Sequence, residues 1–179
     1  CRRRRRRRAS APPPCTPEAG GAPALRLLQR RRRQAGAAMT INRDIPALLH
    51  WIAAHRFQPH SWGRGGCCVS YALGGVHAQT GIDHLADLPV WSTRAEALAV
   101  ARQLGGLTVA LDARLVPIAP ALAQRGDIAG LADRAFGVRL MIVEGELLSG
   151  PGELRQERLP RSAMVRAWSA LPAGEPASE

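Results

Sequence analysis

Histidine and lysine are the scarce residue types of this 179-residue chain. All five histidines lie between residues 50 and 84, so the last 95 residues hold no imidazole that could act as a general base. Lysine is absent, and all 25 basic side chains are arginines. No apolar run approaches the roughly 18 residues of a membrane span. We therefore expect a soluble, intracellular protein.

Cysteine is also sparse. Of the four cysteines, Cys1 and Cys15 lie in an unusual N-terminal segment, and Cys67 and Cys68 are neighbours. Adjacent Cα atoms, about 3.8 Å apart, are closer than an ordinary disulfide allows. The chain is therefore not a disulfide scaffold, and we expect reduced thiols.

The net charge of +11 resides entirely in residues 1–38, which contain 12 arginines and one acidic residue, whereas residues 39–179 contain 13 of each. Uninterrupted arginine runs and several prolines make this head typical of a disordered segment. Two interpretations are open. The head is a basic arm that binds nucleic acid, or it is not part of the natural protein, which then begins at Met39, the first methionine.

Residues 39–171 are predicted to form one domain, followed by a disordered tail at residues 172–179. Capping residues and glycine stops predict helices over residues 45–55, 67–79, 93–104 and 107–113. Short apolar or alternating segments predict strands over residues 128–132, 136–143, 146–148 and 154–159. We expect a closing helical turn over residues 162–168. Helices followed by strands indicate an α+β fold, with N-terminal helices packed on a small antiparallel sheet.

Cys67 ends a glycine-rich turn and opens the second predicted helix. The helix dipole and unpaired N–H groups at such a position favour the thiolate, which is the nucleophilic form. Gly65 and Gly66 permit close approach of a substrate and could leave N–H groups to bind an oxyanion. The alternative is that Cys67 packs in the core as a small hydrophobic residue.

A base for Cys67 is hard to find among the histidines. His77 would lie about 15 Å away along the same helix, which leaves the loop residues His60 and His84 as candidates. Loop histidines more often have no catalytic role. A zinc site that includes Cys67 and Cys68 is disfavoured, because adjacent cysteines rarely bind one tetrahedral metal ion. We expect no metal and no cofactor.

Several short motifs follow one another along the domain: Trp62-Gly63-x-x-x-Cys67, Thr80-Gly81-Ile82-Asp83, Trp91-Ser92-Thr93, Gly105-Gly106 and Ala123-Gln124-Arg125-Gly126-Asp127-Ile128. Their order and spacing, over roughly residues 44–170, resemble a family of uncharacterised phage and prophage proteins, domain of unknown function 6950. That family in turn resembles the NlpC-type cell-wall cysteine peptidases, which have a papain-like fold.

The resemblance implies that Cys67 is the nucleophile, on a helix packed against an antiparallel sheet whose first strand follows a Gly-Asp turn. The cleft and motif residues that it indicates are Trp62, Gly63, Gly66, Gly126 and Asp127. Two positions depart from the pattern. Gly65-Gly66 stands where the family commonly has Asn-Asp, and the strand that begins with a histidine in the peptidases corresponds to Ala135-Phe136-Gly137-Val138.

Without an oriented imidazole, a cysteine enzyme loses proton transfer and thiolate stabilisation, each a factor of about 10²–10⁴. We therefore expect a phage or prophage protein of NlpC-like fold with a degenerate cysteine peptidase site. Phage tail proteins are the expected partners, and the expected location is the bacterial cytoplasm and then the phage tail. One alternative is an active peptidoglycan amidase or endopeptidase that uses Cys67. A second is nucleic-acid binding through the basic head.

Overall fold

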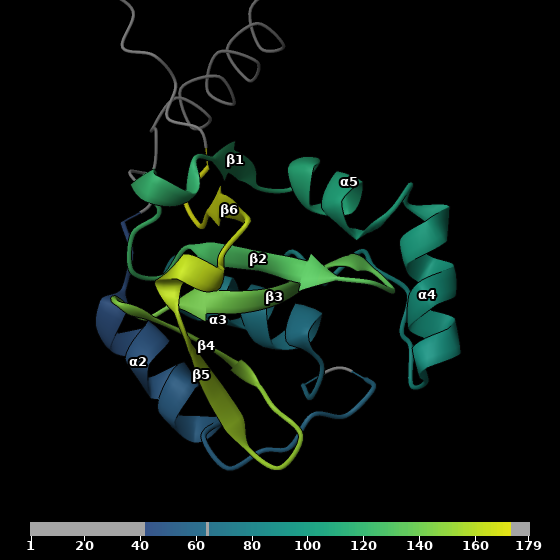
Figure 1. The fold of residues 1–179 in the computed structure, drawn as a ribbon, viewed down its shortest axis with the longest axis horizontal. Coiled ribbons are helices and arrows are strands. Elements are labelled where there is room, and N and C mark those ends of the chain that lie inside the picture. Colours follow the sequence, from purple (N-terminus) through teal and green to yellow (C-terminus); the bar gives the residue numbers. More distant parts are fainter. Residues whose placement is uncertain (1–41, 64, 173–179) are drawn as a thin grey trace, which may run out of the picture. The chain divides into compact units, whose positions relative to one another are not determined.

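The computed structural model describes residues 42–63 and 65–172 (Figure 1). The described residues all belong to one compact unit, which starts at Ile41. The predicted disordered head, the start at Met39 and the tail from residue 173 lie outside the described residues. Those residues form four α-helices and a six-stranded antiparallel sheet, which confirms the predicted α+β class.

The first two helices begin and end at the signals that predicted them. α2 (Ile45–Ala54) is capped by Asp44, whose carboxylate accepts a hydrogen bond from the Ala47 amide at 2.9 Å. α3 (Cys68–Thr80) ends at Gly81, which has the left-handed φ of 75° that glycine adopts readily.

The next two helices also follow their sequence signals. α4 (Arg94–Gln103) starts with the complete capping box that Thr93 and Glu96 predict. α5 (Leu107–Asp112) follows the pair Gly105-Gly106, and both of these glycines have positive φ. Figure 1 shows α4 beyond the end of β2, away from the middle of the sheet.

The sheet has the strand order β1-β6-β2-β3-β4-β5, and all neighbouring pairs are antiparallel. The four predicted strands are present as β2 to β5, each within a few residues of its expected bounds. The six strands are β1 (Val116–Ile118), β2 (Ile128–Asp133), β3 (Gly137–Val143), β4 (Leu147–Pro151), β5 (Gln156–Pro160) and β6 (Arg166–Ser169).

The helical turn predicted over residues 162–168 was wrong. Only Arg161–Ala163 forms a 3₁₀ turn, and the chain then extends into β6. β6 lies between β1 and β2, with Trp168 opposite both Pro117 and Ile128. This pairing supplies partners for the backbone groups of β2 that would otherwise be unpaired at a sheet edge.

α3 covers the centre of one face of the sheet and forms the main core with it (Figure 1). Leu140 and Ile142 alternate along β3 and are fully buried beneath the helix. Gly75 makes the close approach possible, because a Cβ atom there would lie 2.5 Å from the Ile142 Cδ1. The opposite face holds a second cluster that includes Met141, Leu148 and Ala167.

α2 packs on α3 through a single aromatic anchor. A Cβ atom at Gly74 would lie 2.3 Å from the Trp51 ring, so the indole occupies the space above that glycine. Leu48 and Ile52 are buried, whereas Leu49 is 41% exposed. The buried side of α2 is therefore narrow.

Candidate functional site

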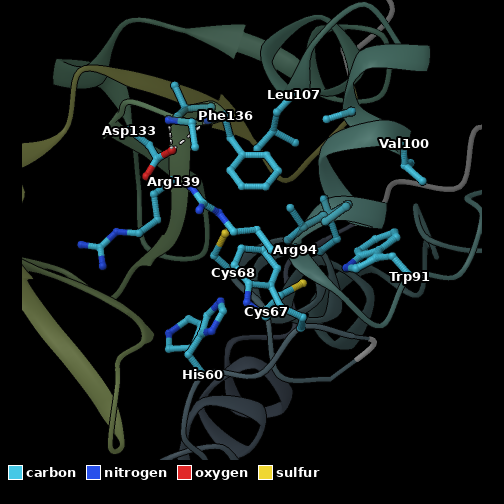
Figure 2. Close-up of a pocket in the computed structure, with 18 of the residues that line it drawn as sticks. His60, Cys67, Cys68, Trp91, Arg94, Val100, Leu107, Asp133, Phe136 and Arg139 are labelled. Atoms are coloured by element: carbon cyan, nitrogen blue, oxygen red, sulfur yellow. Dashed lines mark hydrogen bonds between the residues drawn. The ribbon is translucent and has the colours of Figure 1, made fainter.

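Cys67 is the N-cap of α3 and lies on the wall of a cavity of about 580 Å³. Its backbone is extended and the next residue begins the helix, so the side chain stands at the positive end of the α3 dipole. Figure 2 shows Cys67 and Cys68 near each other among the side chains that line the cavity. Only 3% of Cys67 is exposed to solvent, so a reagent must enter the cavity to meet the thiol.

The glycine-rich turn before Cys67 is closed by backbone hydrogen bonds. The Ser61 amide donates to the Gly66 carbonyl at 3.1 Å, and the Gly66 amide donates to the Gly63 carbonyl at 3.4 Å. A Cβ atom at Gly66 would lie 1.8 Å from the Ser61 Oγ, so a larger residue would force the Ser61 side chain to move. The Gly66 N–H is thus occupied within the turn, contrary to the expectation that it would be free to bind an oxyanion.

The Cys67 thiol takes part in a short hydrogen-bond chain. Its Sγ lies 3.0 Å from the Ser70 Oγ, and the Ser70 hydroxyl donates to the Gly63 carbonyl at 3.0 Å. A hydroxyl has one proton to donate. Because that proton goes to the Gly63 carbonyl, the thiol is the donor toward the Ser70 Oγ.

The strand start that carries histidine in the peptidases has no base here. The Asp133 Oδ1 accepts hydrogen bonds from the Ala135 amide at 2.9 Å and the Phe136 amide at 2.8 Å, which fixes the turn between β2 and β3 (Figure 2). The Phe136 ring stacks on Trp62 with centroids 5.9 Å apart. An aromatic pair, and no imidazole, therefore stands at this turn, and both rings line the same cavity as Cys67.

His60 lines the same cavity as Cys67, although it comes from the loop before the glycine turn. Its amide donates to the Gly152 carbonyl at 2.8 Å, and its ring packs edge-on against Trp62 at 4.9 Å. Burial, and secondarily the positive charge of Arg139, lowers the pKa of His60, so the imidazole is neutral at pH 7. Within residues 42–63 and 65–172, no hydrogen bond joins His60 to Cys67.

The other predicted site residues divide between the two ends of α3. Trp62 lines the cavity, and Gly63 belongs to the turn behind Cys67. Gly126 and Asp127 lie about 18 Å away, near the C-terminal end of the helix. There the Gln79 side-chain amide donates to the Gly126 carbonyl at 2.8 Å.

Asp127 is buried and organises the backbone at that far end. Its carboxylate accepts from the Gln124 amide at 2.6 Å and from the Ala170 amide at 3.0 Å, and it pairs with the guanidinium of Arg43. These bonds connect the turn before β2, the end of β6 and the segment before α2. Asp127 thus lies outside the cavity, and its role is to stabilise the fold by joining these segments.

Most of the residues that line the cavity were not predicted from the sequence, and three of them bear on its chemistry. Cys68 is one of them, and burial raises the pKa of its thiol to about 11, so it stays protonated at neutral pH. Trp91 and Arg94 are the others. The Trp91 side chain is buried, but its indole N–H has no hydrogen-bond partner among the described residues.

Neither a metal site nor a membrane segment is found within the described residues. In that part of the chain no three His, Cys, Asp or Glu side chains come together as they would around a metal ion. No helix there is long and apolar enough to cross a bilayer.

The fold and the site define an α+β domain with a thiol at the start of its central helix, beside a largely apolar cavity at the end of an antiparallel sheet. Residues 39–170 match a family described as a domain of unknown function (DUF6950), and the chain belongs to that family. No curated protein matches the chain.

Proposed function

We propose that this chain is a phage or prophage protein with an NlpC-type, papain-like domain whose cysteine site binds a ligand without hydrolysing it efficiently. The observation that carries the proposal is that Cys67 and Phe136 line the same cavity. The cysteine stands at the start of a central helix packed on an antiparallel sheet, as a papain-like nucleophile does. Phe136, just before β3, stacks on Trp62 and supplies no base.

The hydrogen bonds of Cys67 support binding over catalysis. A cysteine nucleophile reacts as the thiolate, and an adjacent imidazole normally removes and returns the proton. Here the thiol proton is directed at the Ser70 Oγ, whose own proton is directed at the Gly63 carbonyl. The chain of donors ends on a carbonyl that cannot accept a proton at neutral pH, so it offers no route for proton transfer.

Hydrolysis of a peptidoglycan stem peptide tests this proposal. We expect the full chain to release no more product than the Cys67→Ala variant, as measured by mass spectrometry of the reaction mixture. Cleavage by the natural chain that disappears in Cys67→Ala would overturn the proposal. Iodoacetamide labelling, followed cysteine by cysteine in digested protein, adds a direct measurement: Cys67 should react no faster than free glutathione.

His60 supports a second candidate, an active cysteine hydrolase whose base comes from the loop before the helix. A neutral imidazole in the cavity of Cys67 is the form that accepts a proton. If this candidate is right, His60→Ala abolishes both cleavage and fast labelling of Cys67. His77→Ala is the matched control, because His77 is exposed on the far part of α3 and leaves the cavity unchanged.

Association with the phage tail is the remaining part of the proposal. It predicts that the role of the domain is structural, so that Cys67→Ala leaves tail assembly intact. Leu140→Asp places a carboxylate under α3 in the fully buried core and should abolish assembly. Electron microscopy of particles from an induced prophage gives the readout. Normal tails with Leu140→Asp, or missing tails with Cys67→Ala, would contradict the structural role.

A further inference from the structure

The apolar side of α4 faces the cavity and has no core to pack against. None of the residues of α4 is buried, yet its apolar residues recur at the helical spacing of three and four. The four that line the cavity are Ala97, Val100, Ala101 and Leu104. Across the cavity, α5 contributes Leu107 and Leu111, and α3 contributes Val69 and Leu73. Leu73, Leu107 and Leu111 are already buried in the core, so an apolar ligand would cover the half-buried side chains of α4 and of Val69.

A buried donor points to a polar group on that ligand. Trp91 is 5% exposed, and its Nε1 has no hydrogen-bond partner within the described residues. A buried N–H without a partner is unfavourable, and most such groups in folded proteins are satisfied. Figure 2 shows the indole on the cavity wall with its nitrogen toward the interior. The ligand therefore carries an acceptor oxygen.

Arg94 indicates the charge of that acceptor. It lies three residues after Trp91, at the first position of α4, and lines the same cavity. Two other arginines of the lining are neutralised, because Arg139 pairs with Glu157 and Arg114 pairs with Asp87. Arg94 has no ion pair in the part of the chain that the structure describes. An anionic group on the ligand would form an ion pair with the Arg94 guanidinium.

The nearest carboxylate on the same helix does not neutralise Arg94. Glu96 accepts hydrogen bonds from the Ser92 amide at 2.7 Å and from the Ser92 hydroxyl at 3.0 Å, as part of the capping box. These bonds lower the pKa of Glu96 and keep it ionised, but they hold it at the N-cap. Arg94 is exposed to solvent where it lines the cavity, and Glu96 leaves its positive charge available to an outside partner.

We propose that the cavity binds an alkyl carboxylate, with its hydrocarbon chain between α4 and α5 and its carboxylate on the Trp91 indole N–H and Arg94. The proposal deepens the proposed function, because it assumes that the Cys67 cavity is the ligand site and names what enters it. A peptide fits less well, since the wall formed by Val100, Leu104 and Leu107 offers no partners for backbone amides.

Calorimetric titration of the full chain with dodecanoate tests the proposal. We expect saturable binding at one site. Dodecyltrimethylammonium has the same chain length and the opposite charge, so it should bind at least tenfold more weakly. Equal binding of the two amphiphiles would overturn the role of Arg94 and with it the proposal. So would the absence of dodecanoate binding.

Two variants locate the carboxylate. Trp91→Phe keeps an aromatic ring in the wall and removes the donor together with part of the indole, and Arg94→Gln removes the charge and shortens the side chain. Each should weaken dodecanoate binding about five- to tenfold. Arg102→Gln is the control, because Arg102 is an exposed residue of α4 outside the cavity lining and should leave affinity unchanged. Circular dichroism verifies folding. Unchanged affinity in folded Arg94→Gln, or equal loss in Arg102→Gln, would contradict the site.

The same samples separate this proposal from the one on which it rests. If a stem peptide protects Cys67 from iodoacetamide and dodecanoate neither binds nor protects, the ligand class is wrong while the ligand-binding role of the cavity stands. If dodecanoate binds as expected but the chain cleaves a stem peptide through Cys67, the carboxylate site stands and the non-hydrolytic function is wrong.

Discussion

The sulfur of Cys67 and the hydroxyl oxygen of Ser70 lie 3.0 Å apart within the first turn of α3, and the amide of the same serine points at the sulfur at 3.5 Å. The Ser70 hydroxyl accepts a hydrogen bond from the Cys67 thiol and donates one to the Gly63 carbonyl. It therefore connects the glycine turn to the helix. The reactivity of Cys67 and the stability of its turn are therefore coupled through Ser70.

Replacement of Ser70 by alanine tests this coupling. We expect Ser70→Ala to lower the free energy of unfolding by about 1–3 kcal/mol, because the Gly63 carbonyl loses its buried donor. Iodoacetamide labelling of Cys67 should become faster, since the thiol loses its hydrogen-bond acceptor. Urea unfolding and labelling followed by mass spectrometry measure the two effects. Ser162→Ala, at an exposed position, is the control and should change neither. A Ser70→Ala variant with natural stability and labelling would contradict the coupling.

Cys68 gives the domain a distinct response to alkaline pH. Its thiol has a pKa of about 11 in the fold against an ordinary value of about 9, so the unfolded chain loses the proton first as pH rises. Loss of this proton stabilises the unfolded chain relative to the folded one. The free energy of unfolding should therefore fall by about 2–3 kcal/mol between pH 9 and pH 11. Cys68→Ala should lack this component when both proteins are unfolded in urea across that range. An equal fall in both proteins would show that other groups cause it.

Asp127 and Asp87 each pair with an arginine, and the two ion pairs allow the stability contributions of a buried and an exposed carboxylate to be compared. Asp127→Asn leaves Arg43 without its buried partner and weakens two backbone bonds, so we expect a loss of about 3–5 kcal/mol in the free energy of unfolding. Asp87 pairs with Arg114 at 2.9 Å, but its side chain is 71% exposed. Asp87→Asn should cost about 0–1 kcal/mol. Urea unfolding measures both, and similar losses would contradict the architectural role of Asp127.

The need for glycine at position 66 can be tested with a second substitution that relieves the steric clash. Gly66→Ala should lower the free energy of unfolding by about 1–3 kcal/mol, because its Cβ would collide with the Ser61 Oγ. Ser61→Ala removes that oxygen, so the double variant should recover part of the loss. Thermal unfolding of the three variants forms a double-mutant cycle. Strictly additive losses would show that the two side chains do not meet.

The helices could be predicted because their ends are marked by local chemistry. Asp44 and the Thr93-Glu96 pair accept bonds from amides three residues away, and Gly81 adopts the left-handed conformation at the next residue. β1 and β6 could not be predicted, because each has three or four residues and forms only where the other and β2 supply hydrogen-bond partners. The sequence of residues 162–168 alone contains no sign of these partner strands, and it was therefore predicted to be a helical turn.

The position of Cys67 could be predicted from its glycine turn, but the cavity around it could not. Trp91 and Phe136 look like ordinary core aromatics in the sequence. Whether an indole N–H is satisfied depends on residues far away in the chain, and for Trp91 none of the described residues supplies an acceptor. His60 reaches the cavity only because its amide is bonded to Gly152, a contact across 92 residues of chain.

The weak attachment of α4 has a consequence for local stability. The helix has no buried residue and is joined to α5 through Gly105-Gly106, two glycines whose lack of a Cβ atom gives the backbone unusual conformational freedom. Opening of α4 therefore exposes little core and should need much less free energy than global unfolding. Its amide hydrogens will exchange with solvent long before those of α3, and a ligand seated against Val100 and Leu104 would slow that exchange.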